Sequence, residues 1–176
     1  MAMTPADPLR KLLDAAVEGD DRALSELVRL TQSDVWKLCT ALGSAGETED
    51  LVQETYLRAL KSLPTYRGDS LVRTWLLSVS RNVCADHVRR RARQRRLIDR
   101  VTPLAADAVT PGPVYIDEMM DGLSPERRDA FVLTQMIGLS YEEAAQALEV
   151  PIGTVRSRVA RARIDLAAVV RQAEAN

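Results

Sequence analysis

The strongest constraint on the fold lies near the end of the chain, from Pro151 to Arg163. Pro151 favours a helix start, because the first helical N–H groups have no partner inside the helix. Between positions 156 and 171 there are five arginines and one acidic residue. Because the major groove of DNA admits a helix and arginine bonds both guanine edges and phosphates, this helix is predicted to read DNA. Its apolar side chains recur at steps of three and four, the spacing of one buried helical stripe: Ile152, Val155, Val159, Ala162 and Leu166.

A second short helix is predicted directly before it. Ser140 and Glu143 form a capping box, in which each side chain bonds the backbone N–H of the other residue. Small residues over 144–148 allow another helix to cross closely, and Glu149–Val150 is expected to make the turn. This pattern predicts a helix-turn-helix whose second helix is the reader. The alternative is an ordinary amphipathic helix whose arginines are only solvated.

The net charge of −1 conceals alternating charged blocks. Residues 81–100 hold eight arginines and two acids, and residues 151–176 hold five arginines and two acids. By contrast, residues 1–60 hold six basic and eleven acidic side chains, and residues 101–150 hold two and nine. The two basic blocks predict two separate contacts with nucleic acid, and the acidic blocks indicate a protein partner.

Several classes of function are disfavoured. Cys39 and Cys84 lack a CxxC partner and His87 is the single histidine, so neither a metal nor a cofactor is predicted. Both thiols are expected to be buried, in a reducing cytoplasm. Because no apolar run reaches membrane-spanning length and no signal peptide is recognised, we expect a cytoplasmic protein without direct membrane insertion. No nucleophile–base set or glycine-rich phosphate loop occurs, so an enzyme is not predicted.

The first part of the chain is predicted to be helical. Apolar spacing indicates one helix within residues 7–19 and a second within residues 20–43, with a kink or short break near residues 31–33. Trp36 is assigned to the buried stripe of the second helix. Both helices are interpreted mainly as core.

The outer face of a third predicted helix, over residues 48–60, is more informative. It presents Asp50, Gln53, Glu54 and Leu57. An exposed leucine among two acids and an amide indicates a docking surface for a basic partner helix. Acids near a helix N-terminus are also favoured by the helix dipole, so a merely solvated helix explains the same residues. The pattern alone leaves both interpretations open.

A loop over residues 63–69 is predicted to precede a long helix that Ser70 caps and that runs into the arginines of residues 89–100. Tyr66 in the loop and Asn82 on the helix could cradle an unstacked base while the arginines track phosphates of single-stranded DNA. The alternative is a core helix with a solubilising tail, and Trp75 by itself fits the core better than a stacking platform.

Residues 101–118 lack helical periodicity and are predicted to be a flexible linker. A new helix is expected to start at Ser124–Pro125 and to stop at Gly138. The chain is therefore predicted to be all-α, with two small helical domains joined by the linker. The boundaries assigned are 7–93 for the first domain, 94–118 for the linker and 119–171 for the second domain.

Four stretches together resemble one known family. They are Asp50-Leu-Val-Gln-Glu-Thr-Tyr-Leu-Arg58, Arg73-Thr-Trp-Leu-Leu-Ser-Val-Ser-Arg-Asn-Val-Cys-Ala-Asp-His-Val-Arg89, Leu123-Ser-Pro-Glu-Arg127 and Gly153-Thr-Val-Arg-Ser-Arg-Val-Ala-Arg-Ala-Arg163. In this order the chain resembles the extracytoplasmic-function (ECF) group of bacterial RNA polymerase sigma factors, group IV of the sigma-70 family. The resemblance covers about Ala23 to Leu166.

The resemblance implies a region 2 helical bundle, followed by a region 4 helix-turn-helix. It favours a docking face for core polymerase, formed by Asp50, Gln53, Glu54 and Leu57. It implies that the −10 promoter element is bound by Tyr66, Arg67, Trp75, Asn82, Asp86, Arg89 and Arg90. It implies that the −35 element is bound by Thr154, Arg156, Ser157, Arg158, Ala160, Arg161 and Arg163.

The function expected from this resemblance is that of an alternative sigma factor. Its expected partners are the β′ and β subunits of core RNA polymerase, double-stranded promoter DNA, the melted −10 strand and an anti-sigma factor. A standalone helix-turn-helix regulator is the alternative. It explains residues 123–171 but leaves residues 48–93 without a role.

Overall fold

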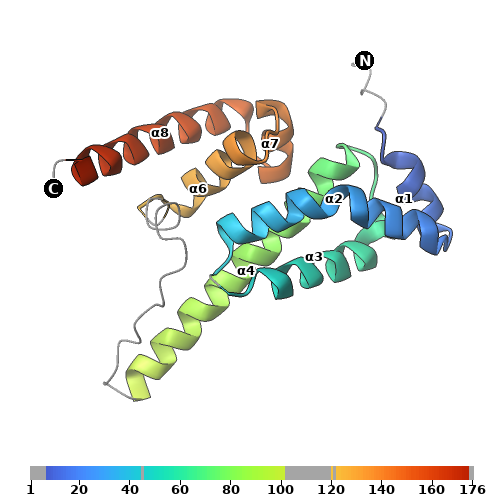
Figure 1. Cartoon of the computed structure of the whole chain (residues 1–176), viewed down its shortest axis with the longest axis horizontal. Coiled ribbons are helices and arrows are strands. Elements are labelled where there is room, and N and C mark those ends of the chain that lie inside the picture. Colours follow the sequence, from blue (N-terminus) through green and yellow to red (C-terminus); the bar gives the residue numbers. More distant parts are fainter. Residues whose placement is uncertain (1–6, 45, 102–119, 121, 175–176) are drawn as a thin grey trace.

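The computed structural model describes residues 7–44, 46–101, 120 and 122–174, and within these ranges the chain forms helices and turns but no strand (Figure 1). The helices are α1 (Arg10–Val17), α2 (Asp21–Leu42), α3 (Thr48–Ser62), α4 (Val72–Val101), α6 (Pro125–Phe131), α7 (Tyr141–Leu148) and α8 (Ile152–Glu174). A 3₁₀ turn covers Leu63–Thr65, and a π-helical segment covers Val132–Met136. The predicted all-α fold is confirmed.

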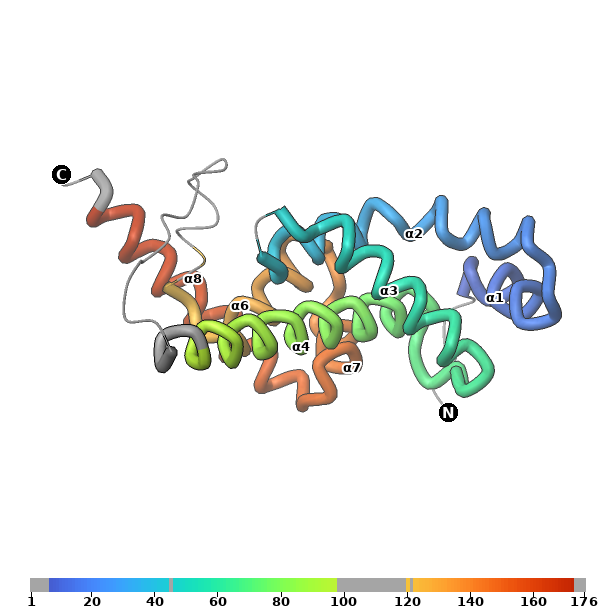
Figure 2. The backbone as a smooth tube through the Cα atoms, turned by 90° about the horizontal axis from the view of Figure 1, so that it is seen from below, coloured from blue at the N-terminus to red at the C-terminus, as the bar shows by residue number. Residues whose placement is uncertain are grey.

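Helix α4 is the axis of the first domain. Helices α2 and α3 both pack along it, and Figure 2 shows α3 and α4 side by side. Large aliphatic side chains such as Leu38 and Leu77 are fully buried between them, each contributing roughly 1.5–3 kcal/mol. Cys39 and Cys84 are also buried in this core, as predicted.

A kink or short break was predicted near residues 31–33; helix α2 runs without interruption for 22 residues, so the short break is wrong. The reason is that the polar residue at this point is satisfied inside the helix. The Thr31 hydroxyl donates to the Leu27 carbonyl at 2.8 Å and lies 2.9 Å from the Tyr56 hydroxyl. At the start of the helix, the Asp20 side chain accepts the first free N–H groups.

The second domain contains the predicted helix-turn-helix. The Ser140 hydroxyl accepts the Glu143 N–H at 3.1 Å, and the Glu143 carboxylate accepts the Ser140 N–H at 2.8 Å, which completes the capping box. Glu149 adopts a left-handed conformation with φ of 54°, which ends α7 and turns the chain into α8. The stripe of α8 faces inward, with Val155 and Val159 fully buried.

The two domains share one continuous apolar core. Helix α7 packs against α4, and the π-helical segment packs against α2. Helix α4 extends to Val101, so the domain boundary assigned at Arg93 falls within it. Residues 102–118 of the assigned linker lie outside the described residues.

Candidate docking and nucleic-acid interfaces

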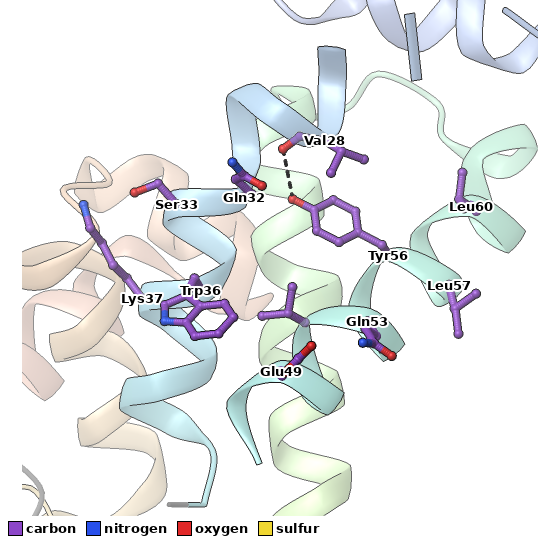
Figure 3. Close-up of a pocket in the computed structure, with 11 residues that line it drawn as sticks. Val28, Gln32, Ser33, Trp36, Lys37, Glu49, Gln53, Tyr56, Leu57 and Leu60 are labelled. Carbon is purple, nitrogen blue, oxygen red and sulfur yellow. Dashed lines mark hydrogen bonds between the residues drawn. The ribbon is translucent and has the colours of Figure 1, made fainter. Parts of the chain in front are cut away.

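An open groove of about 830 Å³ lies between α2 and α3, and Figure 3 shows the side chains that line it. They are Val28, Gln32, Ser33, Trp36 and Lys37 from α2, with Glu49, Val52, Gln53, Tyr56, Leu57 and Leu60 from α3. Trp36 and Leu57 are 50% and 53% exposed, although both are large and apolar. Clustered exposed apolar side chains mark interaction surfaces, so this α2–α3 groove is a candidate docking site.

The floor of the α2–α3 groove is held by Tyr56. Its hydroxyl donates to the Val28 carbonyl at 3.5 Å (Figure 3). The same hydroxyl lies 2.9 Å from the Thr31 hydroxyl. Burial raises the pKa of Tyr56, so the ring stays neutral at physiological pH. Because both helices are tied together at this point, the groove is already formed before a partner arrives, which reduces the entropy lost on binding.

The four predicted docking residues divide between the two sides of α3. Gln53 and Leu57 line the α2–α3 groove. Asp50 is exposed but is not among the lining residues. Glu54 lies toward α4, where its carboxylate accepts a hydrogen bond from Arg58 at 2.7 Å. The structure therefore brings two of the four into the groove.

Trp36 was assigned to the core from its sequence, and this assignment is wrong. It directly follows Val35, which is fully buried, and consecutive helix residues point about 100° apart. It instead forms a ridge with Val28 and Gln32 at steps of four residues. That spacing is present in the sequence, and it was the signal that could have identified Trp36 as part of an interaction surface.

The aromatic residues predicted to contact the −10 strand lie against one another. The rings of Tyr66 and Trp75 are 5.2 Å apart at their centroids and tilted by 49°. The Tyr66 hydroxyl donates to the Ser70 carbonyl, which closes the loop between α3 and α4. Arg67 in the same loop is exposed. The aromatic pair therefore shapes the loop, and Arg67 is left at its surface.

The polar candidates on α4 form an exposed charged strip beyond this loop. Arg58 bridges α3 to α4 by donating to the Asp86 carboxylate at 2.7 Å, and Arg89 donates to the same carboxylate at 2.8 Å. The hydrogen bond from Arg58 is the largest cause that lowers the pKa of Asp86. Asn82 and Arg90 are exposed on the same helix. This strip therefore contains one arginine fixed by a carboxylate, Arg89, and a second exposed arginine, Arg90, and both can contact phosphates.

The predicted −35 residues occupy the outer face of α8. Arg156, Ser157, Ala160, Arg161 and Arg163 are exposed, whereas Thr154 and Arg158 are partly buried. The Ser157 hydroxyl donates to the Thr154 carbonyl at 2.9 Å, and Arg163 donates to the Gln135 side chain at 2.7 Å. Because the opposite stripe is buried, the helix presents this face at a fixed rotation.

The contact between the domains uses arginines of α4. Arg81 donates to the Asp129 carboxylate at 2.7 Å, where the Asp129 side chain is only 12% exposed. Arg73 pairs with Asp34 and also donates to the Ile137 carbonyl at 3.0 Å. Burial outweighs the attraction of Arg81 and raises the pKa of Asp129. The second domain therefore forms hydrogen bonds with two arginines of α4, the same helix that carries the predicted −10 residues.

Within the part of the chain that the structure describes, no helix has the length and apolar character needed to cross a bilayer. Among the same residues, no group of three or more acidic, histidine or cysteine side chains is placed to hold a metal ion.

Two family models match the chain. The model "Sigma-70 region 2" matches residues 27–94, and the model "Sigma-70, region 4" matches residues 114–166. These ranges contain the α2–α3 groove, the α4 strip and the helix-turn-helix.

Similar proteins cover most of the chain. The "ECF RNA polymerase sigma factor SigC" of Mycobacterium tuberculosis is 41% identical over 161 residues, which is 85% of this chain and 84% of that protein. The structure of CnrH in complex with the cytosolic domain of CnrY has a TM-score of 0.74 at 26% identity, covering 93% of this chain and 97% of that one. The sigma factor RpoE in complex with the anti-sigma factor NepR from Bartonella quintana has a TM-score of 0.69 at 28% identity, covering 84% and 96%.

Proposed function

This chain belongs to the extracytoplasmic-function group of sigma-70 factors, and on that premise we propose that it docks on core RNA polymerase through the α2–α3 groove and reads two promoter elements. It is an alternative sigma factor rather than a general DNA-binding regulator. We place its action in the cytoplasm, in transcription initiation, and assign no catalytic step to it.

The observation that carries the docking proposal is the exposed apolar surface of the α2–α3 groove. A helix of the β′ subunit with one apolar face would cover Trp36 and Leu57, and its basic side chains would meet Asp50 and Glu49 at the N-terminal end of α3. Gln53 supplies a polar contact inside the groove. This surface gives the region 2 helices a role, which a helix-turn-helix regulator acting through residues 123–171 alone does not provide.

The promoter proposal rests on two basic surfaces in separate domains. The loop before α4, with Arg67, and the α4 strip, with Asn82, Arg89 and Arg90, would bind the −10 element and its melted strand. The exposed face of α8 would enter the major groove at the −35 element, where Arg156 would bond a base edge and its neighbours would bond phosphates.

Control by an anti-sigma factor is part of the proposal. The solved relatives were captured with the cytosolic domain of CnrY and with the anti-sigma factor NepR. An inhibitor of this class that covered the α2–α3 groove would compete with the polymerase for the same exposed apolar side chains.

The test is run-off transcription with bacterial core polymerase on pooled genomic promoter fragments, with and without this protein. The docking variant is Trp36→Ala/Leu57→Ala. The matched control is Leu30→Ala, because Leu30 is also exposed on α2 but does not line the groove. We expect discrete new transcripts from the wild-type and control proteins and a loss of both transcripts and core binding with the docking variant.

Two other results would count against this function. Sequence-specific DNA binding by the protein alone, without any core-dependent transcript, would favour the standalone regulator. Wild-type transcript levels from the docking variant would show that the α2–α3 groove is not the docking site for core polymerase.

A further inference from the structure

We propose that the N-terminal segment from Asp7 to Arg10 is part of the −10-reading site, with Asp7 and Arg10 acting as positioning residues for the loop between α3 and α4. This inference rests on the proposed function, because it concerns how the −10 strand is captured. The segment lies outside residues 27–94, which the region 2 model matches. Its contacts nevertheless converge on the loop that precedes α4.

Asp7 caps the start of α4 from far away in the sequence. One of its carboxylate oxygens accepts the Val72 N–H at 2.6 Å, across a separation of 65 residues. Val72 is the first residue of α4, so its N–H has no partner within the helix, and water cannot reach it because Val72 is fully buried. A carboxylate at this position also interacts favourably with the helix dipole.

The same carboxylate ties the N-terminal segment to the loop. Its second oxygen accepts the Leu9 N–H at 3.0 Å, where α1 begins. Asp7 therefore links the first turn of α1 to the first turn of α4 through a single side chain. The prediction that Ser70 caps α4 is wrong: the Val72 N–H at the start of α4 bonds Asp7, and the Ser70 carbonyl accepts the Tyr66 hydroxyl.

Arg10 also lies against the loop. Its guanidinium carbon is 5.2 Å from the centroid of the Tyr66 ring, within the range of a cation–π interaction. Asp14 fixes its orientation through a hydrogen bond of 2.9 Å. At Gly68, where φ is +80°, an added Cβ would come within 2.7 Å of the Arg10 side chain. Arg10 therefore contacts two loop residues on either side of Arg67.

A small apolar cluster supports these polar contacts. Leu13 of α1 is buried with Leu27, Leu63 and Val72, and Tyr66 packs on the cluster. The ends of the loop, at Leu63 and Val72, are thus both held by the helix that carries Arg10. A loop held in one conformation loses less entropy when it captures an unstacked base. Without Asp7, the buried Val72 N–H at the α4 end of the loop would lose its hydrogen-bond partner, which would weaken this end of the loop.

The test uses the full-length protein with core polymerase and compares Asp7→Ala, Asp7→Asn and Arg10→Ala. Lys11→Ala is the matched control, because Lys11 is an exposed cation on α1. The first readout is the rate of open-complex formation on duplex promoter DNA. We expect Asp7→Ala to slow opening about 5-fold, the factor that corresponds to the typical loss of one helix cap. Asp7→Asn should restore most of the rate, because asparagine is an equally good cap.

The second readout separates positioning from general stability. Each base of the −10 element is replaced in turn, and the discrimination factor of each variant is compared with that of the wild-type protein. We expect Asp7→Ala and Arg10→Ala to lose discrimination at the base captured by the loop while core binding and −35 discrimination stay unchanged. An unchanged −10 profile with wild-type opening rates would overturn the inference, and so would an equal loss of core binding and −35 recognition. Absence of transcripts from the wild-type protein would instead reject the proposed function.

Discussion

Replacing Arg81 by alanine should open the contact between the two domains. The Arg81 side chain is 29% exposed and that of Asp129 is 12% exposed, and their 2.7 Å bond joins α4 to α6. The arrangement in which the two domains pack against each other is called closed here. Burial raises the pKa of Asp129, so keeping this carboxylate charged in the closed arrangement has a desolvation cost. Removing Arg81 leaves that charge buried without this partner, which disfavours the closed arrangement.

The size of the effect follows from the partial burial of the pair. Hydrogen bonds to charged groups contribute about 1.5–3 kcal/mol, and loss of one partner from a fully buried ion pair costs about 3–5 kcal/mol. Because Arg81 retains some solvent contact, we expect a value near 2 kcal/mol, which shifts the closed-to-open equilibrium by roughly 30-fold. Asp129→Ala should shift it less, since that change also removes the buried charge, and the double variant should recover part of the loss.

The assay is single-molecule energy transfer between dyes on Ser25→Cys and Gln146→Cys. Both positions are exposed and lie on different domains, whereas the native thiols of Cys39 and Cys84 are buried, which shields them from the dyes. We expect a new low-transfer population for Arg81→Ala and none for the control Arg156→Ala. An unchanged distribution for Arg81→Ala, together with no coupling in the double-mutant cycle, would refute the assignment of this ion pair to domain closure.

Three further predictions concern single positions. Ser140→Ala removes half of the capping box and should lower the free energy of unfolding by about 1 kcal/mol in urea titrations, whereas an effect below the measurement error would mean that water replaces the cap. Arg156→Ala should cost about 1–3 kcal/mol of discrimination at one −35 base pair, and uniform weakening on all sequences would make Arg156 a phosphate contact. Asp86→Asn should destabilise the protein by at most about 0.5 kcal/mol at neutral pH, because both side chains of the pair keep contact with solvent. Since Arg58 lowers the pKa of Asp86 in the folded state, this difference should be present above the unfolded value of 3.8 and disappear as the pH falls through the lowered pKa, and a difference independent of pH would contradict the ion pair.

Local signals in the sequence were sufficient for the helix-turn-helix and its ends. The Ser140–Glu143 capping box, the turn at Glu149 and the buried stripe of α8 were all predicted, and all are present. Each depends on side chains within a few residues of one another, so the short-range pattern contains the information. The short break expected near residues 31–33 is absent because the Thr31 hydroxyl donates to the Leu27 carbonyl within the same helix, and its second contact, with Tyr56, lies 25 residues away.

The α2–α3 groove, the Asp7 cap and the contact between the domains could not be predicted from the sequence, because they depend on which helix faces pack together. The sequence alone determined that the chain is all-α, with a helix-turn-helix and basic segments in two domains. Only the tertiary structure decided that Trp36 opens onto a groove beside Leu57, that Asp7 caps α4 and that Arg81 joins the domains to each other. The physical reason is that periodicity specifies which face of a helix is apolar, whereas the partner of that face is selected by packing between segments far apart in the chain.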